Sequence, residues 1–290
     1  MTTTLSNIVA GCWRMSEWGW TPQQRLAWIE ANIERGATSF DHADIYGGYT
    51  VEVLFGEALA LKPALREKMQ LVSKCGIKLI SPARPGHRIK SYDSSREHII
   101  ASVENSLKQL NTDRLDLLLL HRPDALLDAD EVAEAFDMLK RAGKVLSFGV
   151  SNYTPAQFEL LNARTPLATN QIELHPLQRE PLHDGTLDQA QHLKLRPMIW
   201  SPLAGGRLFT GNEDDAKRVR AALEAAGASR GASIATAAYA WLLRHPSRPI
   251  PIVGSQRLQA LDEALAALDW RMDAETWWSI WEAGSGHEVA

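Results

Sequence analysis

The chain has 290 residues, of which 45% are hydrophobic and 23% are charged, so it is long and apolar enough to bury a large core. Its formal net charge of −4 provides no basic excess for binding nucleic acid or an anionic membrane. We find no apolar run of about 18 residues and no secretory leader, and we therefore expect a cytoplasmic protein with one domain over residues 1–290.

Short apolar runs alternate with longer amphipathic ones along the chain, which is typical of strands alternating with helices. Thr21-Pro22 and Thr154-Pro155 each place a capping residue before a proline, and Ser94-Ser-Arg-Glu97 resembles a capping box. Strands are predicted at residues 7–12, 38–40, 70–73, 115–120, 145–150, 168–172, 197–200 and 249–253. Helices are predicted at residues 21–36, 51–61, 99–110, 130–142, from 154 onward, 185–195, 213–226, 233–244, 258–268 and 274–282.

This alternation favours an α/β protein with a parallel sheet. Leu117-Leu-Leu-Leu120 is the continuous apolar run expected of a strand that is buried on both faces. The eight predicted strands fit a single (β/α)₈ TIM barrel with an extra C-terminal helix. The alternative, a doubly wound dinucleotide-binding fold, lacks a G-x-G-x-x-G motif after its first strand.

Catalytic groups of a TIM barrel lie at the carboxyl ends of its strands, and three polar residues end neighbouring predicted strands here. They are Asp41, Lys74 and His121, and Tyr46 lies in the loop beyond Asp41. We expect Lys74 to lie between the carboxylate and the imidazole, with Tyr46 folded over all three. An ammonium beside the phenol is expected to lower the pKa of Tyr46, so that it can donate and accept a proton.

The other side of the predicted barrel offers groups that suit a planar ring carrying a carboxamide. Its strands end in Ser151 and Asn152, in Gln171, and in Trp200 and Ser201. These residues supply amides and hydroxyls next to a flat aromatic surface. Polar groups on both sides of one barrel end predict a catalytic centre beside a cofactor site.

Two loops are candidates for binding phosphate. The loop Ser201-Pro-Leu-Ala-Gly-Gly-Arg207 exposes backbone N–H groups beside a cation, although its glycines are also explained by a simple turn. Gly254-Ser255-Gln-Arg257 precedes a helix whose N-terminus favours an anion. No carboxylate follows until Asp262, and this favours the 2′-phosphate of NADPH over the free hydroxyl of NADH.

At these positions the sequence resembles the aldo-keto reductase superfamily over nearly its whole length, most closely a bacterial branch described as predicted oxidoreductases. The resemblance is carried by the following motifs: Asp41-His-Ala-Asp-Ile-Tyr46, Lys74, Leu119-Leu-His-Arg-Pro-Asp124, Gly149-Val-Ser-Asn152, Asn170-Gln171, Ser201-Pro-Leu203 and Pro251-Ile-Val-Gly-Ser255. It implies a (β/α)₈ barrel that uses NADPH, with Asp41, Tyr46, Lys74 and His121 as a catalytic tetrad.

The resemblance also implies a set of cofactor contacts. The matching positions are Ser151, Asn152 and Gln171 for the carboxamide, Trp200 for stacking on the nicotinamide, and Ser201, Pro202, Leu203, Gly205, Arg207, Gly254, Ser255 and Arg257 for the rest of the cofactor. The sequence departs from the family pattern in a shortened N-terminus, in Trp200 where Tyr is common, and in Gln256 and Ala264 where Arg and Asn are common. We place Trp13, Trp18, Trp20 and Arg122 in the substrate wall.

The resulting hypothesis is an NADPH-dependent reductase of a small-molecule aldehyde or ketone, in which Tyr46 protonates the carbonyl oxygen and His121 orients it. Two other classes stay open. A cofactor-binding regulatory or redox-sensing subunit would share the fold and turn over little substrate. A metal-dependent hydrolase would use Asp41, His42 and His121, but the chain has no H-x-H or similar close ligand set, so we predict no metal.

Overall fold

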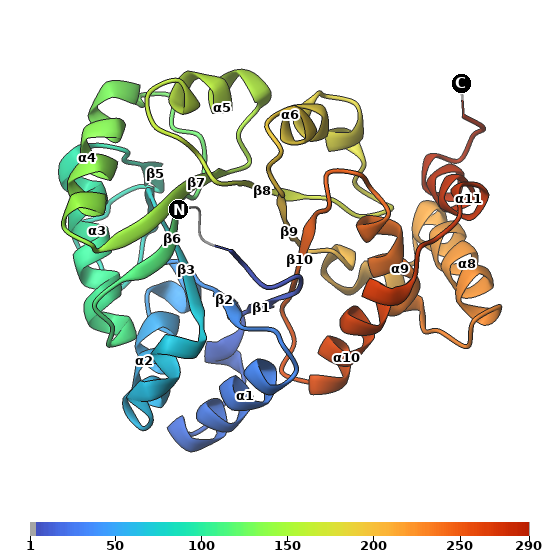
Figure 1. Ribbon diagram of the computed structural model, residues 1–290, viewed down its shortest axis with the longest axis horizontal. Coiled ribbons are helices and arrows are strands. Elements are labelled where there is room, and N and C mark those ends of the chain that lie inside the picture. The colour runs from blue at the N-terminus through green and yellow to red at the C-terminus, as the bar shows by residue number, and fades with distance from the viewer. Residues whose placement is uncertain (1–3, 290) are drawn as a thin grey trace. The chain divides into compact units, whose positions relative to one another are not determined.

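The computed structural model describes residues 4–289 and shows strands alternating with helices along the chain (Figure 1). The barrel strands are β1 (Val9–Gly11), β2 (Ser39–Asp41), β3 (Gln70–Cys75), β6 (Leu115–Leu120), β7 (Val145–Ser151), β8 (Asn170–Glu173), β9 (Met198–Trp200) and β10 (Ile250–Val253). They form a closed barrel in the order β1-β10-β9-β8-β7-β6-β3-β2. The prediction of a TIM barrel is therefore confirmed, and the doubly wound alternative is wrong.

The helices begin and end close to the predicted positions, except for the short α7, which was not predicted. They are α1 (Pro22–Glu34), α2 (Val51–Ala60), α3 (Arg96–Leu110), α4 (Ala129–Arg141), α5 (Pro155–Asn162), α6 (Thr186–His192), α7 (Arg207–Thr210), α8 (Asp214–Ala228), α9 (Ile234–Leu243), α10 (Leu258–Ala266) and the extra C-terminal α11 (Ala274–Ser285). Thr21 and Thr154 each form a full capping box with the glutamine three residues later.

The predicted capping box at Ser94 is wrong by one residue. Ser95 caps α3, because its hydroxyl accepts the backbone N–H of His98. The hydroxyl of Ser94 instead donates to the Asp124 carboxylate at 2.8 Å. The sequence also gave no sign of the antiparallel pair β4 (Ile77–Lys78) and β5 (Ser91–Tyr92), which lies in the segment that follows β3.

The chain divides into two compact units, residues 1–171 with 254–258 and residues 172–253 with 259–290. A single domain over the whole chain stays a prediction. In the first unit, α1 to α4 lie outside the strands that they connect (Figure 1). The core there is apolar: β6 is buried along its whole length, and Phe136 of α4 stacks on Phe148 of β7 at 4.0 Å between ring centroids.

The second unit joins α9 to α11 through a pair of indoles. The rings of Trp241 and Trp277 are stacked at 5.0 Å with an angle of 4° between their planes. Each indole N–H donates to the backbone carbonyl of the other residue, at 3.1 Å and 3.0 Å. This contact fixes the C-terminal helix, and α8 and α11 also pack against each other in this unit (Figure 1).

The predicted shortened N-terminus includes residues 1–3, which lie outside the described residues. Within the described part, the backbone N–H of Ser6 donates to the Ser39 hydroxyl at 2.9 Å, which ties the segment before β1 to β2. No helix in residues 4–289 is long and apolar enough to cross a bilayer.

A glycine in α2 sets the distance between α2 and α3. A Cβ atom built on Gly56 would lie 2.0 Å from the backbone oxygen of Gln109. We predict that Gly56→Ala lowers the free energy of unfolding by about 2 kcal/mol, because overpacking outweighs the ~1 kcal/mol gain in helix propensity. Gly86→Ala is the control, since nothing lies within 4 Å of its Cβ position. Urea unfolding of both variants tests this, and an unchanged midpoint for Gly56→Ala would contradict it.

Candidate active site

The ends of three adjacent strands bring together the first three candidate catalytic residues. Asp41 is the last residue of β2, Lys74 the fifth of β3, and His121 directly follows β6. β3 is paired in parallel with both β2 and β6. The Lys74 ammonium contacts both carboxylate oxygens of Asp41 at 2.8 Å and donates to the backbone carbonyl of His42 at 2.7 Å. Its side chain is fully buried.

Tyr46 completes this cluster from the turn after β2. Its hydroxyl oxygen accepts a hydrogen bond from Lys74 Nζ at 3.0 Å and donates to Asp41 Oδ2 at 3.4 Å. Its ring centroid lies 4.9 Å from the ammonium and 6.0 Å from that of the His121 ring. The four predicted residues therefore lie around one point, and their catalytic roles stay predictions.

The expectation that the pKa of Tyr46 is lowered is wrong for the folded chain. Burial raises the pKa of Tyr46 well above its usual value, and the negative charge of Asp41 adds to this. Arg122 acts in the opposite direction and is too weak to reverse the shift. Burial also lowers the pKa of Lys74, while Asp41 opposes that change. Loss of water around the charged forms outweighs the favourable ammonium contact.

His121 is a neutral imidazole in this environment. Burial lowers its pKa well below the usual value, and the positive charges of Lys74 and Arg122 lower it further. A neutral imidazole carries one N–H donor and one acceptor nitrogen. His121 Nδ1 is buried and has no hydrogen-bond partner among the described residues. The ring can thus act as a neutral hydrogen-bonding group at the site.

Ser151, Asn152 and Gln171 form a connected network at the ends of β7 and β8. Asn152 Nδ2 donates to the Ser151 hydroxyl at 2.7 Å, and that hydroxyl donates to the Gln171 backbone carbonyl at 2.9 Å. Asn152 adopts a left-handed backbone conformation, with φ of 59°. The Gln171 side chain donates to Asp41 Oδ1 at 2.8 Å. Gln171 therefore connects the predicted carboxamide site directly to the catalytic cluster.

The segment Gly254-Ser255-Gln-Arg257 belongs to the same unit and leads into α10. The Ser255 hydroxyl accepts the backbone N–H of Arg257 at 3.1 Å, so the turn before the helix is ordered by a side chain. Arg257 is exposed immediately before the first residue of α10. Its guanidinium and the N-terminus of α10 both favour the binding of an anion.

The remaining predicted cofactor residues lie in the second unit. Trp200 ends β9, and the turn after it has positive φ at Ser201, Ala204, Gly205 and Gly206. Three of its N–H groups are used inside the turn: Ala204 donates to the Ser201 carbonyl, Gly206 to the Leu203 carbonyl and Arg207 to the Ala204 carbonyl. The turn is strained and ordered, but only part of its backbone is available to bind phosphate.

The cation of this loop has carboxylate neighbours of its own. The Arg207 guanidinium lies 3.7 Å from Glu213 and 4.0 Å from Asp215, and about half of its side chain is exposed. Pro202 and Leu203 take part in the turn as the sequence places them.

Comparisons with known proteins identify the family of this chain. The model of the aldo/keto reductase family matches residues 7–284. The chain belongs to that family. It is 50% identical to oxidoreductase YdhF of Escherichia coli, over 98% of this chain and 95% of that protein. It is 43% identical to a 6-dehydroglucose reductase of Agrobacterium fabrum, over 99% of this chain and 96% of that protein.

A solved structure supports the same assignment. An aldo/keto reductase from Klebsiella pneumoniae, crystallised with NADP and acetate, is 29% identical, covers 95% of this chain and 90% of its own, and superposes with a TM-score of 0.76. As an aldo/keto reductase family member, this chain is an oxidoreductase of the carbonyl-reducing type.

The predicted substrate wall divides into two kinds of residue. Trp13 is more than half exposed, and the Arg14 guanidinium lies over its ring, 5.4 Å from the ring centroid. Trp18 packs on Trp20 at 4.8 Å and on Trp28 of α1 at 5.1 Å, which explains both as packing residues. For Trp18 and Trp20 the contacts support packing, and a role in the substrate wall stays a prediction.

Arg122, which was predicted to line the substrate wall, lies directly beside His121 and Ser151. Its Nη1 donates to the His121 backbone carbonyl at 2.9 Å and contacts the Ser151 hydroxyl at 3.5 Å. Its charge also shifts the pKa values of Tyr46, Lys74 and His121. Arg122 therefore belongs to the electrostatic surroundings of the tetrad.

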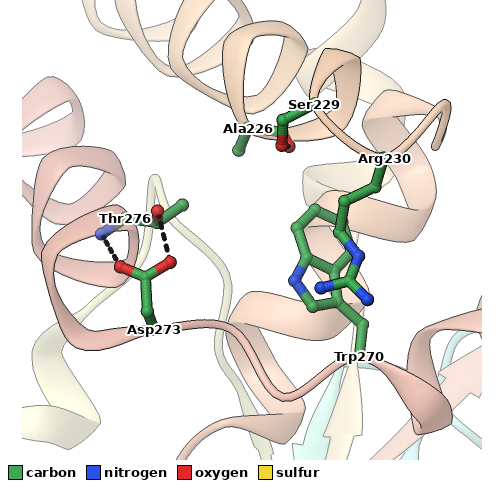
Figure 2. Close-up of a pocket in the computed structure, with 6 residues that line it drawn as sticks. All are labelled: Ala226, Ser229, Arg230, Trp270, Asp273 and Thr276. Atoms are coloured by element: carbon green, nitrogen blue, oxygen red, sulfur yellow. Dashed lines mark hydrogen bonds between the residues drawn. The ribbon is translucent and has the colours of Figure 1, made fainter.

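The structure also has a surface hollow of about 550 Å³ in the second unit, lined by Ala226, Ser229, Arg230, Trp270, Asp273 and Thr276 (Figure 2). The Arg230 guanidinium covers the Trp270 ring at 5.3 Å. Both carboxylate oxygens of Asp273 accept hydrogen bonds from Thr276, as a cap of α11. These groups are engaged with one another, and none of them is a predicted site residue.

The described residues supply no ligand set for the alternative of a metal-dependent hydrolase. Among residues 4–289, no three His, Cys, Asp or Glu side chains lie close enough to hold a metal ion. His42 is fully buried against Phe55, and burial lowers its pKa to about 3.

The sequence analysis overlooked two buried carboxyls beside the tetrad, Asp44 and Glu52. Asp44 had a signal, since it lies inside the motif that ends in Tyr46, whereas Glu52 lies six positions beyond it in α2.

Lys74 and Asp41 offer a stability test that needs no substrate. We predict that Lys74→Met lowers the free energy of unfolding by about 3 kcal/mol, because it leaves a buried carboxylate without its ammonium partner. Asp41→Asn should also destabilise, and the double variant should lose much less than the sum of both. Urea unfolding of the three variants measures the coupling. Strictly additive losses would show that the two side chains do not interact as described.

Proposed function

We propose that this protein reduces an aldehyde or ketone to an alcohol with NADPH, and that Tyr46 donates the proton to the carbonyl oxygen. The observation that carries the proposal is the Tyr46 hydroxyl, held between the Lys74 ammonium at 3.0 Å and Asp41 at 3.4 Å. The raised pKa of Tyr46 keeps its hydroxyl protonated at neutral pH, which is the state that a proton donor needs, but it also makes the phenol a weaker acid, so the proposal requires the phenolate to be stabilised as the proton leaves.

The other residues of the tetrad position and tune this donor. Lys74 donates to the phenol oxygen and thereby stabilises the phenolate that forms when the proton leaves. Asp41 holds the ammonium by two contacts and prevents it from moving towards solvent. His121, neutral and facing the Tyr46 ring, donates a hydrogen bond that orients the carbonyl.

The donor set at the ends of β7 and β8 fits a nicotinamide cofactor, which supplies the hydride when bound. Ser151, Asn152 and Gln171 carry both donors and acceptors, as a carboxamide requires. In the same unit, the segment from Gly254 to Arg257 would hold phosphate. Trp200 and the Ser201–Arg207 turn belong to the second unit, and their cofactor contacts stay predictions from the sequence. The Klebsiella relative that binds NADP supports this choice.

The relatives suggest which substrate to test first. Two of them, at 43% and 39% identity, are named 6-dehydroglucose reductase, and we propose a sugar that carries an aldehyde as the first candidate. Turnover of such an aldehyde would also distinguish an enzyme from the alternative, a regulatory subunit that binds the cofactor without reducing the aldehyde. We expect the protein to act in the cytoplasm.

Replacing Tyr46 tests the proton donor. We predict that Tyr46→Phe binds NADPH as tightly as the wild type and loses carbonyl reduction by about 100-fold or more, because only the donor is removed. Steady-state kinetics with a reactive aldehyde and a fluorescence titration of NADPH measure the two properties. Tyr49→Phe is the control, since Tyr49 bonds to the backbone at Leu79 rather than to the tetrad. Reduction at the wild-type rate in Tyr46→Phe would exclude Tyr46 as the donor.

Replacing Arg257 tests the cofactor preference. A guanidinium that grips a 2′-phosphate contributes about 1.5–3 kcal/mol, or roughly 10- to 150-fold in affinity. We predict that Arg257→Ala weakens NADPH binding at least about tenfold and barely changes NADH binding. Arg271→Ala, at another exposed arginine, should change neither. Equal affinity of the wild type for NADH and NADPH would contradict the preference.

A further inference from the structure

Two carboxyl groups beside Lys74 have no part in the chemistry proposed above. Asp44 follows β2 by three residues, and Glu52 is the second residue of α2. Both are buried, with 6% and 1% of their surface exposed. Each has one oxygen, Asp44 Oδ1 and Glu52 Oε2, that is buried without a hydrogen-bond partner among the described residues. Such groups are costly to keep unless they have a role or hold a proton.

Glu52 holds the strand that carries Lys74. The Ser73 hydroxyl donates to Glu52 Oε1 at 2.6 Å, and both groups are buried. Because side chains alternate along a strand, Ser73 points towards the helices while its neighbour Lys74 points to Asp41 and Tyr46. The Glu52 carboxyl therefore fixes β3 from its outer side, at the residue before the catalytic lysine.

Asp44 holds the same short segment by its backbone. Its N–H donates to the Lys74 carbonyl at 3.1 Å. Asp44 and Glu52 thus contact two consecutive residues of β3. Their carboxyls are also close enough that a charge on Glu52 raises the pKa of Asp44.

The charged groups that face Glu52 come from three other segments. Lys74 of β3 and Arg84 of the loop after β4 lower its pKa, as do the hydroxyls of Ser73 and of Ser106 in α3. The Asp44 carboxyl and the Cys75 thiol also face Glu52, and a charge on Glu52 raises the pKa of both. Burial is the largest effect and raises the pKa of Glu52 to about 7. Burial raises the pKa of Asp44 as well, so both carboxyls hold their protons more tightly than exposed carboxyls do.

We propose that Glu52 is a positioning residue for the catalytic lysine, acting through Ser73, and that the loss of its proton adds a buried negative charge behind the tetrad. The catalytic consequence rests on the function proposed above; the location of the proton does not. A negative charge there favours the Lys74 ammonium and disfavours the Tyr46 phenolate. Ionisation of Glu52 thus lowers the fraction of Tyr46 that is present as the phenolate base for alcohol oxidation at a given pH.

The proton itself is tested without turnover. The infrared spectrum of the wild type should contain a carboxylic acid component that fades as the pH rises through about 7 and that is missing from Glu52→Gln, whereas a component from the buried Asp44 should remain in the variant. Because the folded chain holds this proton more tightly than the unfolded chain, stability should fall as the pH rises from about 5 to 7, and less steeply in Glu52→Gln. Glu57→Gln, on the same helix, changes a half-exposed carboxylate that pairs with the buried Arg25, and it should retain the band and the slope.

The effect on the tetrad is tested by the pH profile. In Glu52→Gln the amide oxygen can still accept the Ser73 hydroxyl, so the fold is preserved and only the charge is removed. We expect the rising limb of kcat/KM for alcohol oxidation to move to lower pH by about half a unit or more, a shift that lost packing alone would not produce. Ser73→Ala provides a second route, since it keeps Glu52 but raises its pKa by removing a donor.

Three results would overturn the proposal. An infrared band that is unchanged in Glu52→Gln would place the proton elsewhere. A profile that is unshifted in both Glu52→Gln and Ser73→Ala, in active enzymes, would reduce Glu52 to a packing residue. A shift of the same size in Glu57→Gln would show a general charge effect. A protein that shows the band and no carbonyl turnover would contradict the proposed function alone.

Discussion

The ammonium of Lys74 is the group on which the site depends. A fully buried cation loses its water, and the chain must replace that water with acceptors at hydrogen-bond distance. Asp41, the His42 carbonyl and the Tyr46 hydroxyl are those acceptors, and they come from the end of β2 and from the turn after it. Keeping the lysine charged therefore requires the same arrangement that places the phenol beside it.

The barrel supplies this arrangement through strand pairing rather than through loops. β2, β3 and β6 are adjacent and parallel, so residues that are far apart in sequence reach one end of the sheet together. The polar residues at the strand ends could be found in the sequence because each follows an apolar run, and β6 was predicted to the residue from its leucines. Fold and cluster were thus predictable from periodicity and from the family resemblance.

The features that could not be predicted are those set by competing effects at short range. The sequence names the ammonium beside Tyr46, but the direction of its pKa shift depends on burial and on the distance to Asp41. Ser94 and Ser95 are the same residue type and are equally suited to cap α3. The carboxylate of Asp124, thirty positions away, accepts hydrogen bonds from Ser94, which leaves Ser95 as the cap. Glu52 reads as an ordinary helix residue until Ser73 is seen beside it.

The indole pair of α9 and α11 constrains how this sequence can drift. Trp241 and Trp277 each accept the other's N–H at a backbone carbonyl, so losing either ring removes one of the two hydrogen bonds and the ring stacking together, while the bond from the remaining indole to the backbone is kept. A single substitution at either position therefore costs the stacking that the second ring depends on. Among descendants of this chain, the two indoles should be retained together, although they lie 36 positions apart.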